Sequence, residues 1–355
     1  MKIKTEMKRN SKLIITGILI VLVALASSFI RNIRLSEDRY NKIMCYYIAR
    51  NITLNADTPE KKICALRNFV HINIHPIPEY KNRLDTKAID KLVSGIGWCD
   101  QQARVFMQLA RAIGINTRLL FLVNGSGSSP HSIAEAELPN GRWVIVDPFF
   151  NLELRNKKGE LASQLDVKED PAIITDNDKV KLRKPYDKKW SNPDYISIYA
   201  NTPQYIVEKK GVSIDLLRIV PISWIRFFDK YIADIYISQM QKKFKDEFEL
   251  KLVKARTYHL IGYYKGSRSL YNEIIKGSKD PFLICKAEYF KALLLKRQKK
   301  YTKGISFIDE VIHNHDFNPY KVYMIGLMGT FLEKVGKETK AFEVRKEIEY
   351  MLRAI

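Results

Sequence analysis

The chain has 355 residues, of which 46% are hydrophobic and 28% charged, which is long enough for two or three domains and too apolar for a disordered protein. Its 60 Lys and Arg against 39 Asp and Glu give a formal net charge of +21, typical of a lysine-rich solvated surface or of attraction to an anionic surface or polymer. The basic residues are scattered among acidic ones without the signature of a nucleic-acid-binding fold, so we expect no nucleic-acid partner.

Residues 13–30 (LIITGILIVLVALASSFI) form an uncharged apolar run that is long enough to cross a membrane as a helix. The residues before this run are strongly basic, which predicts an N-terminus inside and the rest of the chain outside. Ala24-Leu25-Ala26 also fits a signal-peptide cleavage site, so a removed leader is the alternative to an anchor. We expect residues 1–34 to be a cytoplasmic tail and single-pass anchor that holds the protein at the membrane of a bacterial cell envelope.

Residues 99–113 (CDQQARVFMQLARAI) have the apolar spacing of an amphipathic helix, and Gly114 follows as a helix-ending residue. Gly95 and Gly97 allow a sharp turn into this helix, so Cys99 is predicted at its N-terminus. Unpaired N–H groups and the positive end of the helix dipole stabilise a thiolate there. A lone cysteine is more often a buried apolar residue. The placement of Cys99 favours a nucleophile.

Residues 118–123 predict a strand, and residues 131–138 and 142–147 predict two more around a Pro-Asn-Gly hairpin turn. A three-residue turn places Ile133 opposite Asp147 and puts His131 on the same face as Asp147. A two-residue turn puts them on opposite faces. With three residues, the carboxylate can orient the imidazole, as in a Cys-His-Asp triad. Taken singly, His131 could be a loop-edge histidine and Asp147 a turn former before Pro148.

Three segments, GWCDQQARVFMQLARAIGINTRLLFL, HSIAEAEL and NGRWVIVDPFFN, resemble the core of the transglutaminase-like superfamily. The resemblance covers residues 95–150, with residues 51–93 as a preceding helical part. It implies an α+β papain-like catalytic domain with Cys99 as nucleophile, His131 as general base and then acid, and Asp147 as the residue that orients His131. Arg118 matches the arginine that opens the strand after the helix, and Trp143 matches a structural tryptophan.

Two departures from the family pattern leave the reaction open. The aromatic residue that commonly follows the family's histidine is replaced by Ser132 and Ile133, and no tryptophan matches the oxyanion-binding residue of animal transglutaminases. The backbone N–H of Cys99 is the oxyanion donor that we can name. Peptidase or amidase hydrolysis of a protein or peptide substrate is our preferred expectation. A protein-glutamine transglutaminase and a non-catalytic envelope scaffold are the alternatives.

We expect no cofactor and no metal ion. The four cysteines lack CxxC spacing, and His71 and His75 lack nearby acidic ligands. A Cys45–Cys64 disulfide is conceivable outside the cytoplasm, although spacing does not establish it.

The catalytic domain is predicted at residues 35–200, and its part from 156 to 195 should be mostly loop. Residues 201–250 should be a connecting amphipathic helical region. Its apolar stretch at residues 221–240 is more typical of a buried interdomain helix than of a membrane-interface helix. Residues 251–355 should be an all-α domain that resembles tetratricopeptide repeats and binds partner proteins. Its predicted helix pairs are 285–298 with 303–314 and 319–335 with 338–353, after a degenerate pair at 258–276. An ordinary antiparallel helical bundle would show similar periodicity.

Overall fold

The computed structural model describes residues 37–77, 87–122, 129, 131–175, 204–206, 230, 233–238, 240–241, 243–244, 246–314 and 318–354. Its contacts divide the chain into residues 1–40 and residues 41–355, and the contacts below lie within the second unit. The predicted membrane anchor at residues 13–30 lies outside the described part, as does most of the apolar stretch at 221–240. None of the helices in the described ranges combines the length and apolar character needed to cross a membrane.

The α+β region of the chain, from α2 (Glu37–Ile52) to β4 (Gln204–Ile206), begins with helices whose ends follow from local sequence: α2, α3 (Pro59–Asn73), α4 (Ala88–Ser94) and α5 (Cys99–Ala112). α3 starts where the Thr58 side chain accepts a hydrogen bond from the N–H of Lys61, with a proline in the first helical turn. α4 ends at Gly95, whose φ of 68° is left-handed and therefore favours glycine. α5 ends before Gly114, which also has a positive φ, of 89°.

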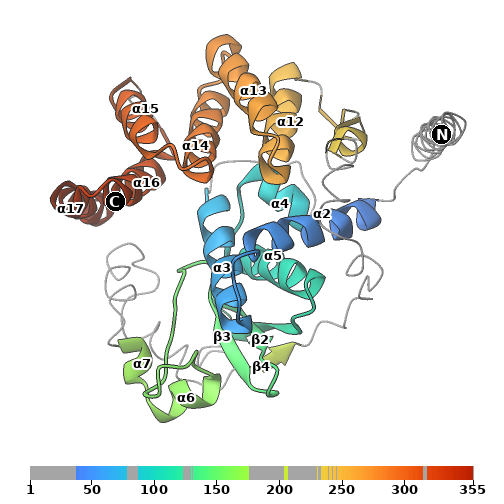
Figure 1. Cartoon of the computed structure of the whole chain (residues 1–355), viewed down its shortest axis with the longest axis vertical. Coiled ribbons are helices and arrows are strands. Elements are labelled where there is room, and N and C mark those ends of the chain that lie inside the picture. Colours follow the sequence, from blue (N-terminus) through green and yellow to red (C-terminus); the bar gives the residue numbers. More distant parts are fainter. Residues whose placement is uncertain are drawn as a thin grey trace, which may run out of the picture. The chain divides into compact units, whose positions relative to one another are not determined.

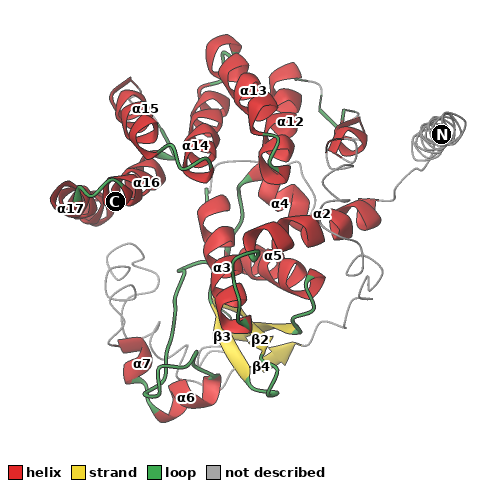
Figure 2. Cartoon of the chain, in the orientation of Figure 1, coloured by secondary structure: helices red, strands yellow, loops and turns green. Residues whose placement is uncertain are grey.

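A four-stranded antiparallel sheet follows, with the strand order β3-β2-β1-β4. Its strands are β1 (Thr117–Leu122), β2 (His131–Glu137), β3 (Trp143–Val146) and β4 (Gln204–Ile206). α5 packs on β1 and β2, and it also contacts α3 and α4, so the helix that carries Cys99 lies between the sheet and other helices (Figures 1 and 2). This arrangement is an α+β architecture, as expected from the sequence.

In the middle of the chain, the structure shows elements at two places where the sequence did not predict them. β4 lies within residues 201–250, which we expected to be a helical connection outside the catalytic domain, yet it pairs with β1. A three-residue edge strand is too short to show a period in the sequence. The stretch expected to be loop also contains two short helices, α6 (Gln164–Glu169) and α7 (Ala172–Thr175). Ser163 and Asp166 exchange side-chain-to-backbone hydrogen bonds at the N-terminus of α6, and this Ser-x-x-Asp capping pattern is a local sequence signal of a helix start.

The C-terminal helices are α12 (Glu247–Ile261), α13 (Tyr264–Gly277), α14 (Pro281–Arg297), α15 (Tyr301–Asn314), α16 (Lys321–Lys334) and α17 (Glu338–Ala354). We call α12 to α17 the helical array. Each helix packs on the next, and α12, α14 and α16 also contact one another in series. The two predicted helix pairs after residue 280 correspond to α14 with α15 and to α16 with α17. The resemblance to tetratricopeptide repeats stays a prediction.

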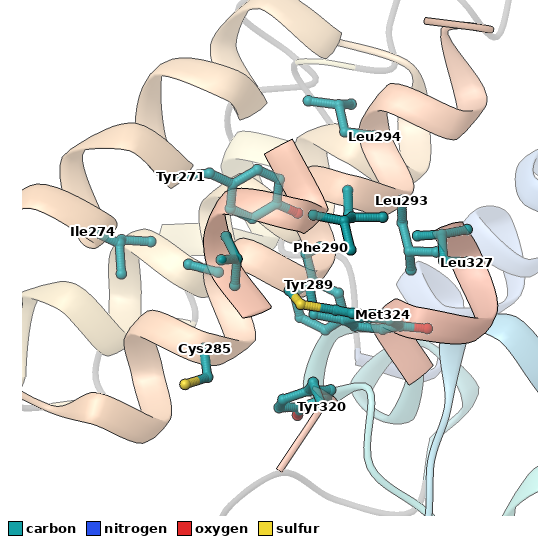
Figure 3. Close-up of a cluster of buried hydrophobic side chains, with 14 of the residues drawn as sticks. Tyr271, Ile274, Cys285, Tyr289, Phe290, Leu293, Leu294, Tyr320, Met324 and Leu327 are labelled. Carbon is teal, nitrogen blue, oxygen red and sulfur yellow. The ribbon is translucent and has the colours of Figure 1, made fainter. Parts of the chain in front are cut away.

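One hydrophobic core joins the helical array to the α+β region. Most of its buried side chains come from α12 to α16, and Figure 3 shows a group of them, including Tyr271, Tyr289, Phe290 and Met324. The same cluster contains Ile77, which follows α3, and Ile96, which lies just before α5. Apolar burial is therefore continuous from the array to the chain that enters the cysteine-bearing helix.

Candidate active site

Cys99 is the first residue of α5, and the residue before it is fully extended, with φ −86° and ψ −178° at Trp98. The N–H of Trp98 donates to the Gln101 side-chain oxygen at 3.1 Å, and the N–H of Gln102 donates to the Trp98 carbonyl at 2.8 Å. The N–H of Cys99 precedes this first helical bond, so it belongs to the donors at the positive end of the helix dipole. The start of α5 therefore supplies the predicted backbone donor for an oxyanion.

His131 opens β2, and Asp147 comes directly after β3. The strands pair Ala134 with Val146, and the N–H of Leu138 donates to the Arg142 carbonyl at 2.9 Å. The hairpin turn therefore holds three residues, which is the register that puts His131 and Asp147 on one face. The His131 Nε2 lies 2.9 Å from the Asp147 Oδ2, and the two side chains are 1% and 0% exposed. The carboxylate thus holds the imidazole away from solvent.

Burial by itself would lower the pKa of His131, but the charge and hydrogen bond of Asp147 raise it, and the Cys99 thiol adds a hydrogen bond and charge of its own. Together these raise the pKa of His131 to about 9. Since Nε2 faces Asp147, Nδ1 is the ring nitrogen left for the Cys99 thiol. The raised pKa favours the imidazolium at neutral pH, which is the form that stabilises a neighbouring thiolate.

The segment after β3 holds Asp147 and the ring in place. The N–H of Phe150 donates to the Asp147 Oδ1 at 3.0 Å, so both carboxylate oxygens accept hydrogen bonds. The rings of Phe149 and Phe150 pack edge-on against the His131 ring, at centroid distances of 5.7 and 5.1 Å. His71 on α3 lies with Nδ1 3.1 and 3.0 Å from the carbonyls of Pro148 and Phe149. This histidine therefore braces the turn that carries Asp147, a role that the sequence did not suggest.

Gln102 is a buried amide on the first turn of α5, and its side chain faces the backbone. Its Nε2 donates to the carbonyls of Ile74 and Gly97, at 3.2 Å each. This amide holds the chain that precedes Cys99, so it is not free to donate to an oxyanion.

Arg118 and Trp143, which the family resemblance singled out, support the hairpin. Arg118 Nε lies 2.6 Å from the Glu135 Oε2, and the guanidinium lies 4.2 Å from the centre of the Trp143 ring. Arg118 is paired directly across from Glu135 in the sheet. These contacts link β1, β2 and β3 beside the His131–Asp147 pair, so both residues have structural roles.

All four cysteines are free, so the conceivable Cys45–Cys64 disulfide is not formed. Burial raises the pKa of Cys45 to about 12 and that of Cys285 to about 11, and it also raises the pKa of Cys64. Cys99 is thus the cysteine placed for nucleophilic chemistry. Among the residues that the structure describes, no group of three or more His, Cys, Asp or Glu side chains is arranged to hold a metal ion.

The family model of the transglutaminase-like superfamily matches residues 46–148, so this part of the chain is a transglutaminase-like domain. The match includes Cys99, His131 and Asp147. No curated protein is significantly similar to the chain. Among solved structures, the chain is similar to a candidate cysteine protease from Cytophaga hutchinsonii, with 19% identity and a TM-score of 0.28. That alignment covers 36% of this chain and 46% of the other, so the chain spans less than half of that structure.

Proposed function

We propose that the chain is a cysteine acyl-transfer enzyme that hydrolyses amide bonds in a protein or peptide. Cys99 is the nucleophile, His131 the general base and acid, and Asp147 the residue that orients His131. The observation that carries this proposal is the buried 2.9 Å bond from His131 to Asp147, on an imidazole whose pKa the Cys99 thiol also raises. A cysteine with only a packing role would need neither an oriented imidazole nor a place at a helix N-terminus.

The reaction follows from these positions. The Cys99 thiolate attacks the amide carbonyl, and the developing oxyanion accepts a hydrogen bond from the Cys99 N–H. The C–N bond breaks as the His131 imidazolium gives its proton to the leaving amine, which leaves a thioester on Cys99. The neutral imidazole then takes a proton from water, and the resulting hydroxide adds to the thioester carbonyl. Cleavage of the C–S bond releases a carboxylic acid, and the thiolate–imidazolium pair is restored. Asp147 stays ionised throughout.

The same acyl-enzyme would react with an amine if one reached the thioester before water. Hydrolysis and amine transfer therefore differ in the second half of the reaction only. Incubation of a glutamine-containing peptide with and without a primary amine separates them: a free acid in both samples supports hydrolysis, whereas an amide product that forms at the expense of the acid supports transglutamination.

We propose further that the apolar run at residues 13–30 anchors the protein in the membrane, with the catalytic domain on the outer side. Its uncharged sequence and the basic residues before it support this topology. The helical array would then present a surface for partner proteins outside the cell membrane.

The first test is iodoacetamide alkylation of the full-length protein as a function of pH. At pH 6.5 an ordinary thiol with a pKa of about 8.5 is only about 1% thiolate. We therefore expect a midpoint well below pH 8, absence of this labelling in Cys99→Ala, and a shift of the midpoint toward 8.5 in His131→Ala. Cys64→Ser is the matched control and should label as the wild type. Labelling that rises only near pH 8.5, with the same midpoint in His131→Ala, would support a binding scaffold instead.

A further inference from the structure

Gly95 and Ile96, in the segment of residues 95–98 before the nucleophile, lie directly against the helical array. Gly95 has a φ of 68°, and a Cβ atom at this position would lie 2.5 Å from the Phe290 Cζ on α14. Phe290 is fully buried, so its ring has no room to withdraw. The backbone at Gly95 and the aromatic ring are therefore in close contact, and any movement of α14 acts on this segment.

A short stretch of backbone pairing holds the 95–98 segment on its other side. The N–H of His75 donates to the Gly95 carbonyl at 3.0 Å, and the N–H of Gly97 donates to the His75 carbonyl at 3.0 Å. His75 thus forms a parallel bridge with Ile96. Because Gly97 precedes Cys99 by two residues, the position of His75 determines where the chain enters α5.

Two tyrosines of the helical array hold the His75 ring. The Tyr289 hydroxyl of α14 donates to the Ile72 carbonyl at 2.7 Å and lies 2.6 Å from the His75 Nε2, so it accepts the hydrogen bond of that nitrogen. The Tyr323 ring of α16 stacks on the His75 ring, with centroids 3.8 Å apart and an interplanar angle of 23°. Figure 3 shows Tyr289 beside Phe290 within the core of the array.

Arg256 of α12 adds a second connection. This side chain is fully buried, and its Nε donates to the Leu92 carbonyl in the last turn of α4 at 3.0 Å. It also donates to the Asn73 side chain at the end of α3, and its guanidinium lies 4.2 Å from the centre of the Phe290 ring. The C-terminal ends of α3 and α4, which precede His75 and Ile96 in the chain, thus both form hydrogen bonds with the array.

We propose that the helical array positions the nucleophile, with Tyr289 and Phe290 as positioning residues that act on Cys99 through His75 and Gly95. The inference rests on the proposed function, because it concerns the reactivity of Cys99. The Cys99 thiol must stay within hydrogen-bond reach of His131, and misplacement by about 1 Å can reduce the rate of an enzyme about 100-fold. The array is therefore part of the active-site framework as well as a surface that can bind partners.

Tyr289→Phe tests this proposal, because it keeps the aromatic ring in the core and removes the hydroxyl that holds His75. We expect the alkylation rate constant of Cys99 at pH 6.5 to fall about 3- to 10-fold in the full-length protein, as expected for the loss of a buried hydrogen bond that maintains geometry. The alkylation midpoint should rise toward 8.5, and with a peptide substrate kcat should fall more than KM rises. Circular dichroism measures the folded fraction in each sample.

Tyr258→Phe is the matched control, since the hydroxyl of Tyr258 on α12 also donates a hydrogen bond to a residue outside the array, Asp234 at 2.6 Å, but does not touch His75. Its alkylation profile should equal that of the wild type. Tyr323→Leu, which removes the stacked ring and keeps the Tyr289 hydroxyl, is the second variant. Wild-type alkylation profiles in folded Tyr289→Phe and Tyr323→Leu would overturn this inference and leave the proposed function intact. A wild-type protein without reactivity below pH 8 would overturn both.

Discussion

At the residue scale, the His131–Asp147 pair depends on the buried negative charge of the Asp147 carboxylate. Asp147→Asn keeps the shape of the side chain and removes this charge, so the pKa of His131 should fall from about 9 toward or below its ordinary value. The imidazolium is then lost at neutral pH, and Cys99 alkylation at pH 7 should fall about tenfold or more. The pH profile of alkylation measures this effect. Asp57→Asn on the surface is the control, and an unchanged profile in Asp147→Asn would contradict the assigned role.

The same pair predicts how stability depends on pH. Because folding raises the pKa of His131 from 6.5 to about 9, its contribution to stability is complete below pH 6.5 and is lost as the pH rises through 9. The difference in unfolding free energy between wild type and Asp147→Asn should therefore be larger at pH 6 than at pH 10. Urea unfolding at the two pH values measures it. An equal difference at pH 6 and pH 10 would show that the imidazole is neutral in the folded protein throughout this range.

Arg67 ties α3 to the segment that follows Asp147. Its buried guanidinium donates to the Asn151 side chain, the Leu152 carbonyl and the Glu153 carboxylate, each at 2.9 Å. Arg67→Ala leaves these acceptors without their donor and should destabilise the fold by about 2–3 kcal/mol. Arg155→Ala, which removes a more exposed partner of Glu153, should cost less than about 1 kcal/mol. Denaturant unfolding measures the free energy of unfolding of both variants. Equal losses in Arg67→Ala and Arg155→Ala would contradict the structural role of Arg67.

The pH dependence of the Arg67 contact has the opposite sign. Burial would raise the pKa of Glu153, but hydrogen bonds and charges from Arg67 and Arg155 lower it to about 2. The stabilising contribution is therefore present above pH 4.5 and is lost as the pH falls through about 2. The difference in unfolding free energy between wild type and Arg67→Ala should accordingly decrease as the pH falls from 4.5 toward 2, which urea unfolding at several pH values measures.

At the element scale, the junction between α4 and α5 depends on Gly95. Gly95→Ala should destabilise the protein through backbone strain of about 1 kcal/mol and, in addition, through the contact of the new methyl group with Phe290. Gly141→Ala is the matched control: its φ of 81° gives similar strain, but nothing lies within 4 Å of the new methyl group. Unfolding free energies should be lower for Gly95→Ala than for Gly141→Ala. Equal values would mean that Phe290 does not press on this backbone.

The elements differ in how far the sequence revealed them. α5 and the β2–β3 hairpin were predictable, since an amphipathic period and a Pro-Asn-Gly turn are local signals. The hairpin was predictable only up to a choice between two turn lengths, and the observed register selects the three-residue turn. β4 was missed because its three residues are a strand only by pairing with β1. The bracing role of His71 was missed because its partners are carbonyl groups nearly eighty residues away.

At the scale of the whole molecule, the continuous core predicts that the catalytic region depends on the helical array. A chain that ends at residue 245 would expose Ile77 and Ile96, which pack in the core of the array, and would lose the contacts of Tyr289 and Phe290. We expect this truncation to lower the thermal midpoint and to abolish low-pH alkylation of Cys99. A chain that ends at residue 336 lacks only α17, which packs on α16. It should largely keep the thermal midpoint and the low-pH alkylation of Cys99. Full Cys99 reactivity in the shorter chain would contradict the dependence.

Several features could be predicted from local sequence: the candidate triad of Cys99, His131 and Asp147, the helix that begins at the cysteine, and the two helix pairs after residue 280. These features depend on turn chemistry and on periods within a few residues of each other, which a single sequence displays. Two contacts became visible in the folded chain alone: Tyr289 holds His75, 214 residues away in the chain, and Phe290 fills the space that a side chain at Gly95 would need. Such contacts follow from how packed surfaces meet, and no local period records which distant side chains will face each other.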